Sequence, residues 1–268
     1  MKELTLQELK EIEFDILKMF DSFCRDNNIK YYLAFGTLLG AIRYKKFIPW
    51  DDDVDVLVPR EDYEKLIRIF RDDSKYCLFA FEKNHYFHYP FAKLCDMTTK
   101  KEQTVYKNRN VELGVEIDIF PLDLWDNDFE KAKIEAARIK KYQKWLKMTK
   151  LDKPLTTTPL KRILWQGVIL FAKLIGGGFF VKRMVKESNK PSQSGSKFAG
   201  VKVWAIYGER GIIPAEVFAD TTYVEFEGEM FPAPAGYDTY LTCLYGDYMP
   251  EPPVEKRKTH HSFKAYRL

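Results

Sequence analysis

Apolar side chains recur every three or four residues from position 5 to position 27, which predicts one long helix whose apolar stripe covers a sheet. More strongly charged helical patterns follow at about 61–71 and 127–150. Short β-branched and aromatic runs predict strands at 31–35, 54–58, 76–81, 89–94 and 114–120. A chain of 268 residues can hold one domain of helices and strands with a helical elaboration, or two small domains.

The first predicted strand ends at a glycine turn. Gly36 and Thr37 form this turn, and a short helix is expected at 38–43. Glycine allows a ligand to approach the backbone closely, and Thr37 is expected to cap the helix with its hydroxyl. Because the free N–H groups of a helix N-terminus favour an anion, the turn is typical of a phosphate site.

An acidic run leads into the second predicted strand. Three valines alternate with Asp53 and Asp55 there, so these two carboxylates are expected on one strand face. Carboxylates held so close repel each other unless a cation lies between them, and a set of oxygen ligands selects Mg²⁺ or Mn²⁺. Asp51 and Asp52 precede the regular strand and are expected in the turn or as support for the ligands.

The acidic run also has a plainer interpretation, a solvated turn before a strand. Two neighbouring features favour the metal site instead. The Gly-Thr turn is close in sequence, and the later strand at 114–120 again places two acids, Glu116 and Asp118, on one face. A Gly-Thr turn before a helix, two acids one residue apart and a third acid on a later strand together form the signature of a nucleotidyltransferase fold.

Four further side chains are candidates for binding substrate. Arg43 and Lys45 lie between the turn and the acids, where either could hold a donor diphosphate or simply be exposed; Arg43 is favoured because its guanidinium can grip two phosphate oxygens. Lys93 lies inside an apolar strand pattern, where a charge needs a partner, and is therefore a pocket candidate. Trp50 adjoins the acids and could face a quaternary ammonium group or serve only in packing.

Three separated motifs carry a family resemblance that extends over roughly the whole chain. They read GTLLGAIRYKKFIPWDDDVDV at 36–56, EIDIFPLD at 116–123 and YLTCLYGDYMPEPPVEKRKTHH at 240–261. In this order they resemble the LicD family, the phosphocholine transferases that decorate bacterial surface glycans. The same core resembles the fukutin-related transferases, which move ribitol phosphate from a cytidine nucleotide.

The resemblance implies an α+β fold in which helices flank a nucleotidyltransferase-like mixed sheet. It divides the chain into a catalytic core at 1–125, a helical elaboration at 126–200 and a C-terminal segment at 201–268 that folds back on the core. It also implies dependence on Mg²⁺ and a CDP-alcohol donor, with CDP-choline favoured. The last motif places His260 over the site as a substrate-binding residue.

The reaction implied by the resemblance is an in-line attack by a sugar hydroxyl on the distal phosphorus of the CDP-alcohol. Asp53 and Asp55 would hold Mg²⁺ against the diphosphate, CMP would leave, and Asp118 would orient or deprotonate the hydroxyl or be a third metal ligand. The acceptor would be a glycan or a lipid-linked glycan. The same residues would equally serve a nucleotidyltransferase that attacks a nucleoside triphosphate and releases pyrophosphate. A non-catalytic nucleotide- or glycan-binding protein is the alternative of another class, and the retained acids argue against it.

Composition adds little about partners. The net charge of +4 is mild and gives no case for a nucleic-acid partner. The four cysteines are scattered without a CxxC pair, which argues against zinc and against a disulfide framework. The charged, amphipathic N-terminus lacks the continuous apolar core of a signal peptide, so a cytoplasmic location is expected.

One segment, at 163–181, is almost continuously apolar and has basic flanks. It has three interpretations: a membrane-spanning helix, a helical hairpin packed on the protein itself, or a peripheral contact with the inner face of the membrane. Gln166, Lys173 and the glycines at 176–178 argue against the spanning helix.

Overall fold

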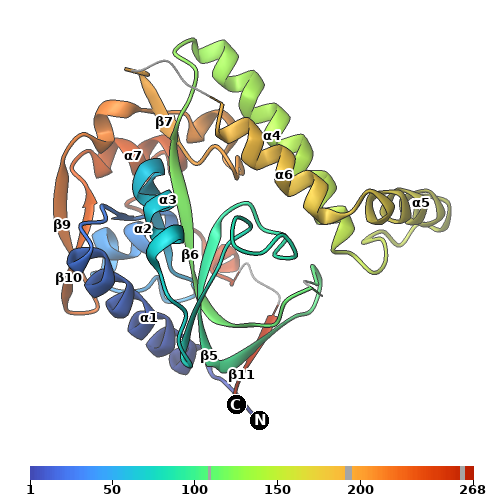
Figure 1. Ribbon diagram of the computed structural model, residues 1–268, viewed down its shortest axis with the longest axis horizontal. Helices are drawn as coiled ribbons and strands as arrows, with labels where there is room; N and C mark the ends of the chain where they lie inside the picture. Colours follow the sequence, from blue (N-terminus) through green and yellow to red (C-terminus); the bar gives the residue numbers. More distant parts are fainter. Residues whose placement is uncertain (108–109, 191–194, 260–262) are drawn as a thin grey trace.

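The computed structural model describes residues 1–107, 110–190, 195–259 and 263–268. Its centre is a twisted mixed sheet (Figure 1), which comprises nine strands within these residues. The main path through the sheet runs β1 (Lys2–Glu3), β11 (Phe263–Arg267), β5 (Ala92–Gln103), β6 (Leu113–Leu124), β3 (Asp55–Pro59) and β2 (Tyr32–Leu33). Off this path, β4 (Tyr76–Phe79) pairs with β5, and β7 (Phe198–Gly200) joins β6 to β8 (Ile213–Pro214).

The two longest strands, β5 and β6, have 12 residues each; most of β6 and the first half of β5 are buried, so they form the centre of the sheet. β3 and β6 are parallel, whereas β5 and β6 are antiparallel. Gly114 sits at the start of β6 because a Cβ there would lie 2.0 Å from the carbonyl oxygen of Asp96 on β5. Its missing side chain lets the two strands approach at an irregular point in their register.

Helix α1 (Leu6–Asp26) covers one face of the sheet. Thr5 and Glu8 form a reciprocal capping box that fixes its start. The apolar stripe buries Ile16, Leu17 and Phe20 completely in the main core. The helix predicted at 5–27 is thus confirmed, since both its cap and its apolar period are local signals.

The remaining elements around the sheet pack mainly against its main core. They are α2 (Phe35–Tyr44), α3 (Arg60–Ile69), the hairpin of β9 (Thr221–Phe226) and β10 (Glu229–Pro234), and α7 (Tyr237–Tyr245). Three short 3₁₀ turns complete the description: Gly208–Gly211, Ala215–Phe218 and Val254–Lys256. Near the termini, β11 pairs with both β1 and β5, so the end of the chain returns to the sheet.

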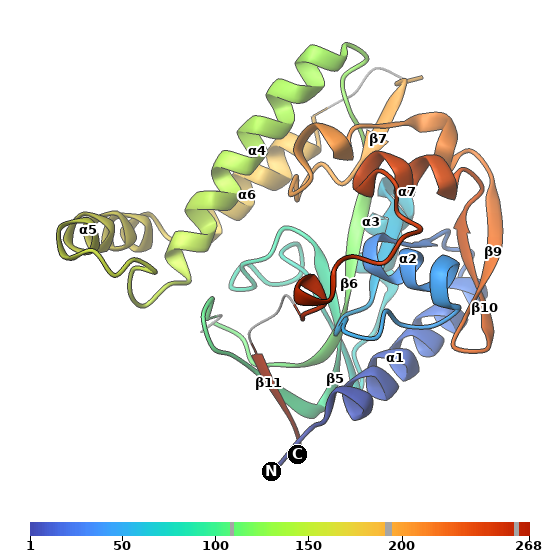
Figure 2. The same ribbon diagram turned by 180° about the vertical axis from the view of Figure 1, so that it is seen from behind.

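A separate helical layer lies across one end of the sheet (Figures 1 and 2). It consists of α4 (Phe129–Thr149), α5 (Pro159–Ile175) and α6 (Gly177–Ser188). α4 and α6 pack side by side on a second hydrophobic core that contains Trp125, Ile139 and Met184. In both views α5 projects away from the body of the protein.

The α+β class with a mixed sheet is confirmed. The predicted strand at 31–35 is wrong in its extent, because only Tyr32–Leu33 pairs as a strand and Phe35 already begins α2. The helix predicted at 38–43 therefore starts three residues earlier than expected. The division into parts at 125 and 200 stays a prediction.

No single helix in the described ranges is long and apolar enough to cross a membrane. α5 and α6 reach that length and composition only together, and they are bent by 71° at the break between them. The glycines expected to interrupt the apolar segment do lie at this break.

Candidate active site

Three charged side chains lie in register across three adjacent strands. Asp55 on β3 pairs with Asp118 on β6, and Asp118 in turn pairs with Lys93 on β5. Residues paired across neighbouring strands point to the same face of a sheet, about 5 Å apart at the backbone. The sheet therefore presents two carboxylates and an ammonium group in one row.

Lys93 is the buried counter-ion of this row. Its Nζ donates to Asp118 and, at 3.0 Å, to Glu116. Burial would lower the pKa of Lys93, but Asp118 and Glu116 together raise it well above the ordinary value. Lys101 donates a second bond to Glu116 at 2.9 Å, and despite its burial the pKa of Glu116 falls to about 2. Both lysines are thus held charged by fixed partners.

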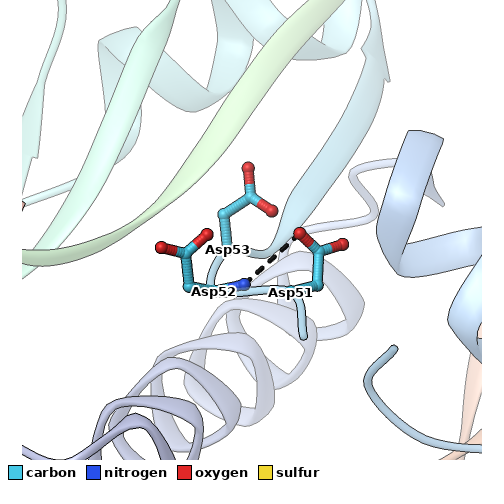
Figure 3. A group of neighbouring side chains, drawn as sticks. All are labelled: Asp51, Asp52 and Asp53. Carbon is cyan, nitrogen blue, oxygen red and sulfur yellow. Dashed lines mark hydrogen bonds between the residues drawn. The ribbon is translucent and has the colours of Figure 1, made fainter. Parts of the chain in front are cut away.

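The turn before β3 adds a compact acidic cluster, which Figure 3 shows. Carboxylate oxygens of Asp51, Asp52 and Asp53 lie within 4.8 Å of one another. Burial and the neighbouring charge of Asp53 raise the pKa of Asp51 to about 7. Burial also raises the pKa of Asp55 well above its ordinary value, reinforced by Asp53, Asp118 and Asp51. The four neighbouring carboxyl groups, at positions 51, 52, 53 and 55, therefore disfavour one another's ionisation.

Asp51 lies closer to this centre than the sequence pattern indicated. The regular strand begins only at Asp55, so the preceding turn brings Asp51 back beside Asp53. Asp52 is buried, whereas Asp51, Asp53 and Asp55 are half-buried. The pairing of Asp53 with Asp55 as metal ligands stays a prediction, and Asp51 joins them as a third candidate.

The donor set of this cluster fits a hard divalent cation. All of its side-chain donors are carboxylate oxygens, the ligands that Mg²⁺ and Mn²⁺ prefer. Glu13 on α1 is wholly buried nearby, and neither of its carboxylate oxygens has a hydrogen-bond partner among the residues that the structure describes. Burial raises its pKa well above normal, and Asp53, Glu116 and Asp52 add to the shift although Lys101 opposes it. A cation would relieve this accumulated repulsion.

Gly36 and Thr37 both lie beside the acids. A Cβ on Gly36 would come within 2.5 Å of an Asp51 carboxylate oxygen, so glycine is what lets α2 approach the cluster. The prediction that Thr37 caps the helix is wrong, because Ala34 occupies the cap position and offers no side-chain bond. The buried Thr37 hydroxyl instead accepts the N–H of Asp55 at 2.9 Å, which ties α2 to the start of β3.

Three of the other predicted binding residues have partners within the protein itself. Arg43 donates to the backbone carbonyls of Tyr248 and Pro250, so its guanidinium anchors the segment after α7. Lys45 is mostly exposed and pairs with Glu225 at 2.7 Å. The Trp50 ring has the guanidinium of Arg257 5.4 Å from its centroid, and His260 lies outside the described residues.

The structure adds an aromatic wall that the sequence reasoning missed. The ring of Phe35 stacks on Tyr207 with centroids 5.4 Å apart, and the Tyr207 hydroxyl lies 2.9 Å from that of Tyr245. Burial raises the pKa of Tyr207 to about 12, and the charges of Asp55, Asp53 and Asp51 contribute to that shift. Phe35 has a φ of 44°, a left-handed conformation, and its N–H donates to the Tyr240 hydroxyl at 3.3 Å. No periodic pattern marks these tyrosines, because they come from separate irregular or short elements.

Sequence comparison places this site in a known class. Residues 28–167 match the model of the "LicD/FKTN/FKRP, nucleotidyltransferase domain" family. This range contains the acidic turn, all three strands of the charged row and α4. The protein is therefore an enzyme, a phosphotransferase built on a nucleotidyltransferase-like core.

The chain belongs to the LicD family. It is 32% identical over 285 aligned positions to the lipopolysaccharide cholinephosphotransferase LicD of Haemophilus influenzae, and the match covers the whole of both chains. It is also 38% identical over 63 residues to an uncharacterised protein of Rickettsia typhi, a match that covers 23% of this chain and 20% of that protein. The predicted family resemblance is thus confirmed.

Proposed function

We propose that the protein transfers phosphocholine from CDP-choline to a sugar hydroxyl of a surface glycan, such as lipopolysaccharide or its lipid-linked precursor. The observation that carries the proposal is the charged row of Asp55, Asp118 and Lys93 beside the acidic turn, in a chain similar over its full length to a lipopolysaccharide cholinephosphotransferase. Phosphoryl transfer needs positioning and charge neutralisation more than covalent chemistry, and this row offers both.

In the proposed step the acceptor oxygen attacks the distal phosphorus of CDP-choline. The bond from that phosphorus to the bridging oxygen breaks, and CMP leaves with the electron pair. The hydroxyl proton passes to a carboxylate, for which Asp118 is the candidate, unless Asp118 is a metal ligand and solvent takes the proton. Lys93 holds the Asp118 carboxylate in place.

Asp53, together with Asp55 or Asp51, would hold Mg²⁺. When bound, the ion would neutralise the donor diphosphate and stabilise the leaving phosphate. Asp55 would be held by β3, whereas Asp51 and Asp53 would come from the turn that precedes it. Such prepositioned carboxylates would need little reorganisation at the moment of reaction.

The first expected result concerns the donor. Incubation with Mg²⁺, an acceptor glycan and CDP-choline should release CMP, while EDTA should abolish the release. CDP-ribitol, CDP-glycerol and CTP serve as matched donors that differ in the transferred group, and mass spectrometry of the products identifies what moved.

Two outcomes would replace this proposal. Pyrophosphate release from CTP with no CMP from any CDP-alcohol would indicate a nucleotidyltransferase. Tight nucleotide binding without any turnover would indicate a binding protein. A preference for CDP-ribitol or CDP-glycerol would retain the reaction type and change only the donor.

We further propose that α5 rests on an anionic membrane surface at the cytoplasmic side, where a lipid-linked acceptor would be found. The helix buries only Ile169 and Ala172. Six of its apolar side chains are more than half exposed: Leu160, Ile163, Leu164, Leu170, Phe171 and Leu174. α6 therefore packs on the protein, as the hairpin interpretation expects, whereas α5 packs against α4 along one side and leaves most of its apolar side chains exposed.

The basic charge around α5 favours an anionic membrane over a second protein copy as the partner of this apolar face. From 153 to 186 the sequence has seven basic residues and no acidic one. An exposed apolar helix with basic flanks fits the boundary of an anionic bilayer, where apolar burial and electrostatic attraction add. A second copy of the chain would bring like charges together.

Cosedimentation with vesicles tests this contact. The protein should bind vesicles containing phosphatidylglycerol, and bind less at high salt. Ile163→Ser with Leu174→Ser should abolish binding without lowering the melting temperature, since these side chains are 74% and 84% exposed. Met230→Ser with Val254→Ser, exposed apolar residues elsewhere, should bind like the parent. Loss of a dimer in the first variant, with no vesicle binding by the parent, would show instead that α5 binds a second copy.

A further inference from the structure

A cavity of about 270 Å³ opens between the helical layer and the sheet. Its wall includes His88, Lys107, Lys150, Lys173 and the first residue of α6, Gly177. We call this cavity the Lys150 pocket. None of the sequence motifs points to it, because its residues come from separate loops and helix ends.

Lys150 is the reason to look for a ligand here. The side chain follows the last turn of α4 and the residue is only 9% exposed. Within the described ranges its Nζ has neither a hydrogen bond nor an ion pair, and it lies over the face of Tyr89, 3.3 Å from the ring centroid. A buried ammonium group without an acceptor is costly, so an anion is the natural complement.

The rest of the wall is also suited to an anion. Three lysines face one carboxylate, Asp152, which pairs with Lys107 at 3.1 Å and Lys173 at 3.8 Å. α6 starts at this wall, and its N-cap residue, Gly176, has no side chain to cap the first N–H groups. Gly177 lets the helix start close to His88, because a Cβ there would lie 2.5 Å from the ring Nδ1.

The pocket adjoins the charged row of the candidate active site. Lys150 and Lys93 lie over the same Tyr89 ring, 3.3 and 5.0 Å from its centroid, and Lys93 is bonded to Asp118. Burial lowers the pKa of Lys150 well below normal, and the nearby charge of Lys93 adds to this shift although Asp118 opposes it. The helical layer thus brings a buried amine that has no bonded anion to the edge of the reaction centre, and a bound phosphate would favour its charged form.

We infer that the Lys150 pocket binds a phosphate group of one of the two substrates, so that α4 and α6 form one wall of the active site. This inference rests on the proposed function for the identity of the substrates. The phosphate can come from the donor diphosphate or from a phosphorylated sugar of the acceptor, and both present the same chemistry to Lys150.

Binding of inorganic pyrophosphate, measured by calorimetry without Mg²⁺, tests the pocket directly. Lys150→Met keeps the aliphatic length and removes the charge, and should weaken binding by about tenfold or more. Its melting temperature should stay equal or rise, because a buried charge is lost. Lys150→Arg should retain binding. Lys141→Met, which removes an exposed lysine of the same helix, is the matched control and should bind like the parent.

Kinetics then identify the source of the phosphate. A raised KM for CDP-choline alone would assign the pocket to the donor, and a raised KM for the acceptor alone would assign it to the glycan. Unchanged pyrophosphate binding in Lys150→Met would overturn the inference, as would a lower melting temperature with unchanged affinity, which indicates a purely structural lysine. Since pyrophosphate binding needs no turnover, a wrong donor would not be mistaken for a failed pocket.

Discussion

Replacing Asp53 or Asp55 with asparagine is expected to lower kcat by roughly two to four decades, which corresponds to about 3–5 kcal/mol of transition-state stabilisation. The amide keeps the size of the side chain and removes the charge that would hold the metal. The measurement is CMP release at saturating Mg²⁺ and donor. Near-normal turnover in both variants would contradict the metal assignment.

Stability provides the control for this experiment. Burial and three neighbouring carboxylates raise the pKa of Asp55, so its charge opposes folding in the metal-free protein. Asp55→Asn should therefore melt at the same or a higher temperature than the parent while losing activity. Asp26→Asn, at the exposed end of α1, removes one acidic charge far from the cluster and should leave both properties unchanged.

Replacing Lys93 with methionine should cost about 3–5 kcal/mol of unfolding free energy, a large part of the 5–15 kcal/mol typical of a domain. Lys93 is buried between Glu116 and Asp118, and its loss leaves Asp118 without its ammonium partner and Glu116 with Lys101 alone. Urea unfolding monitored by circular dichroism measures the change.

The matched variant is Lys75→Met, at the residue just before β4. Lys75 is 47% exposed and pairs with Asp96 at 3.8 Å, so its removal should cost less than about 1 kcal/mol. Adding Asp118→Asn to Lys93→Met should recover part of the lost stability, since the carboxylate left without its ammonium partner disappears while Glu116 keeps its bond to Lys101. Equal losses in the two lysine variants would show that the row is not a tightly coupled buried network.

Local sequence patterns determined much of this fold. The capping box at Thr5 and the apolar period after it define α1, and the alternation after the acidic run defines β3. Spacing alone also drew attention to Asp118 and to the buried charge of Lys93. Such signals are carried by neighbouring residues in the chain, and three motifs in order were enough to indicate the LicD family.

The tertiary structure decided which of the candidate side chains meet. Strand register places Asp55, Asp118 and Lys93 in one row, and register depends on pairing between residues far apart in sequence. Long-range contacts also set the partners of two other candidates. Arg43 donates to the carbonyls after α7, and the Thr37 hydroxyl accepts the N–H of Asp55 on β3.

In the helical layer, too, the sequence shows the composition of a segment and only the tertiary structure shows what covers it. The apolar and basic composition of 163–181 is plain in the sequence, but composition cannot say which neighbour covers an apolar face. Only packing shows that α4 covers the apolar side of α6 while most apolar side chains of α5 are left exposed. Lys150 carries no sequence signal at all, because its burial and its place beside Tyr89 arise only when the end of α4 meets the sheet. The sequence therefore determined the local elements and the family, whereas non-local packing alone decided the surroundings of each charge.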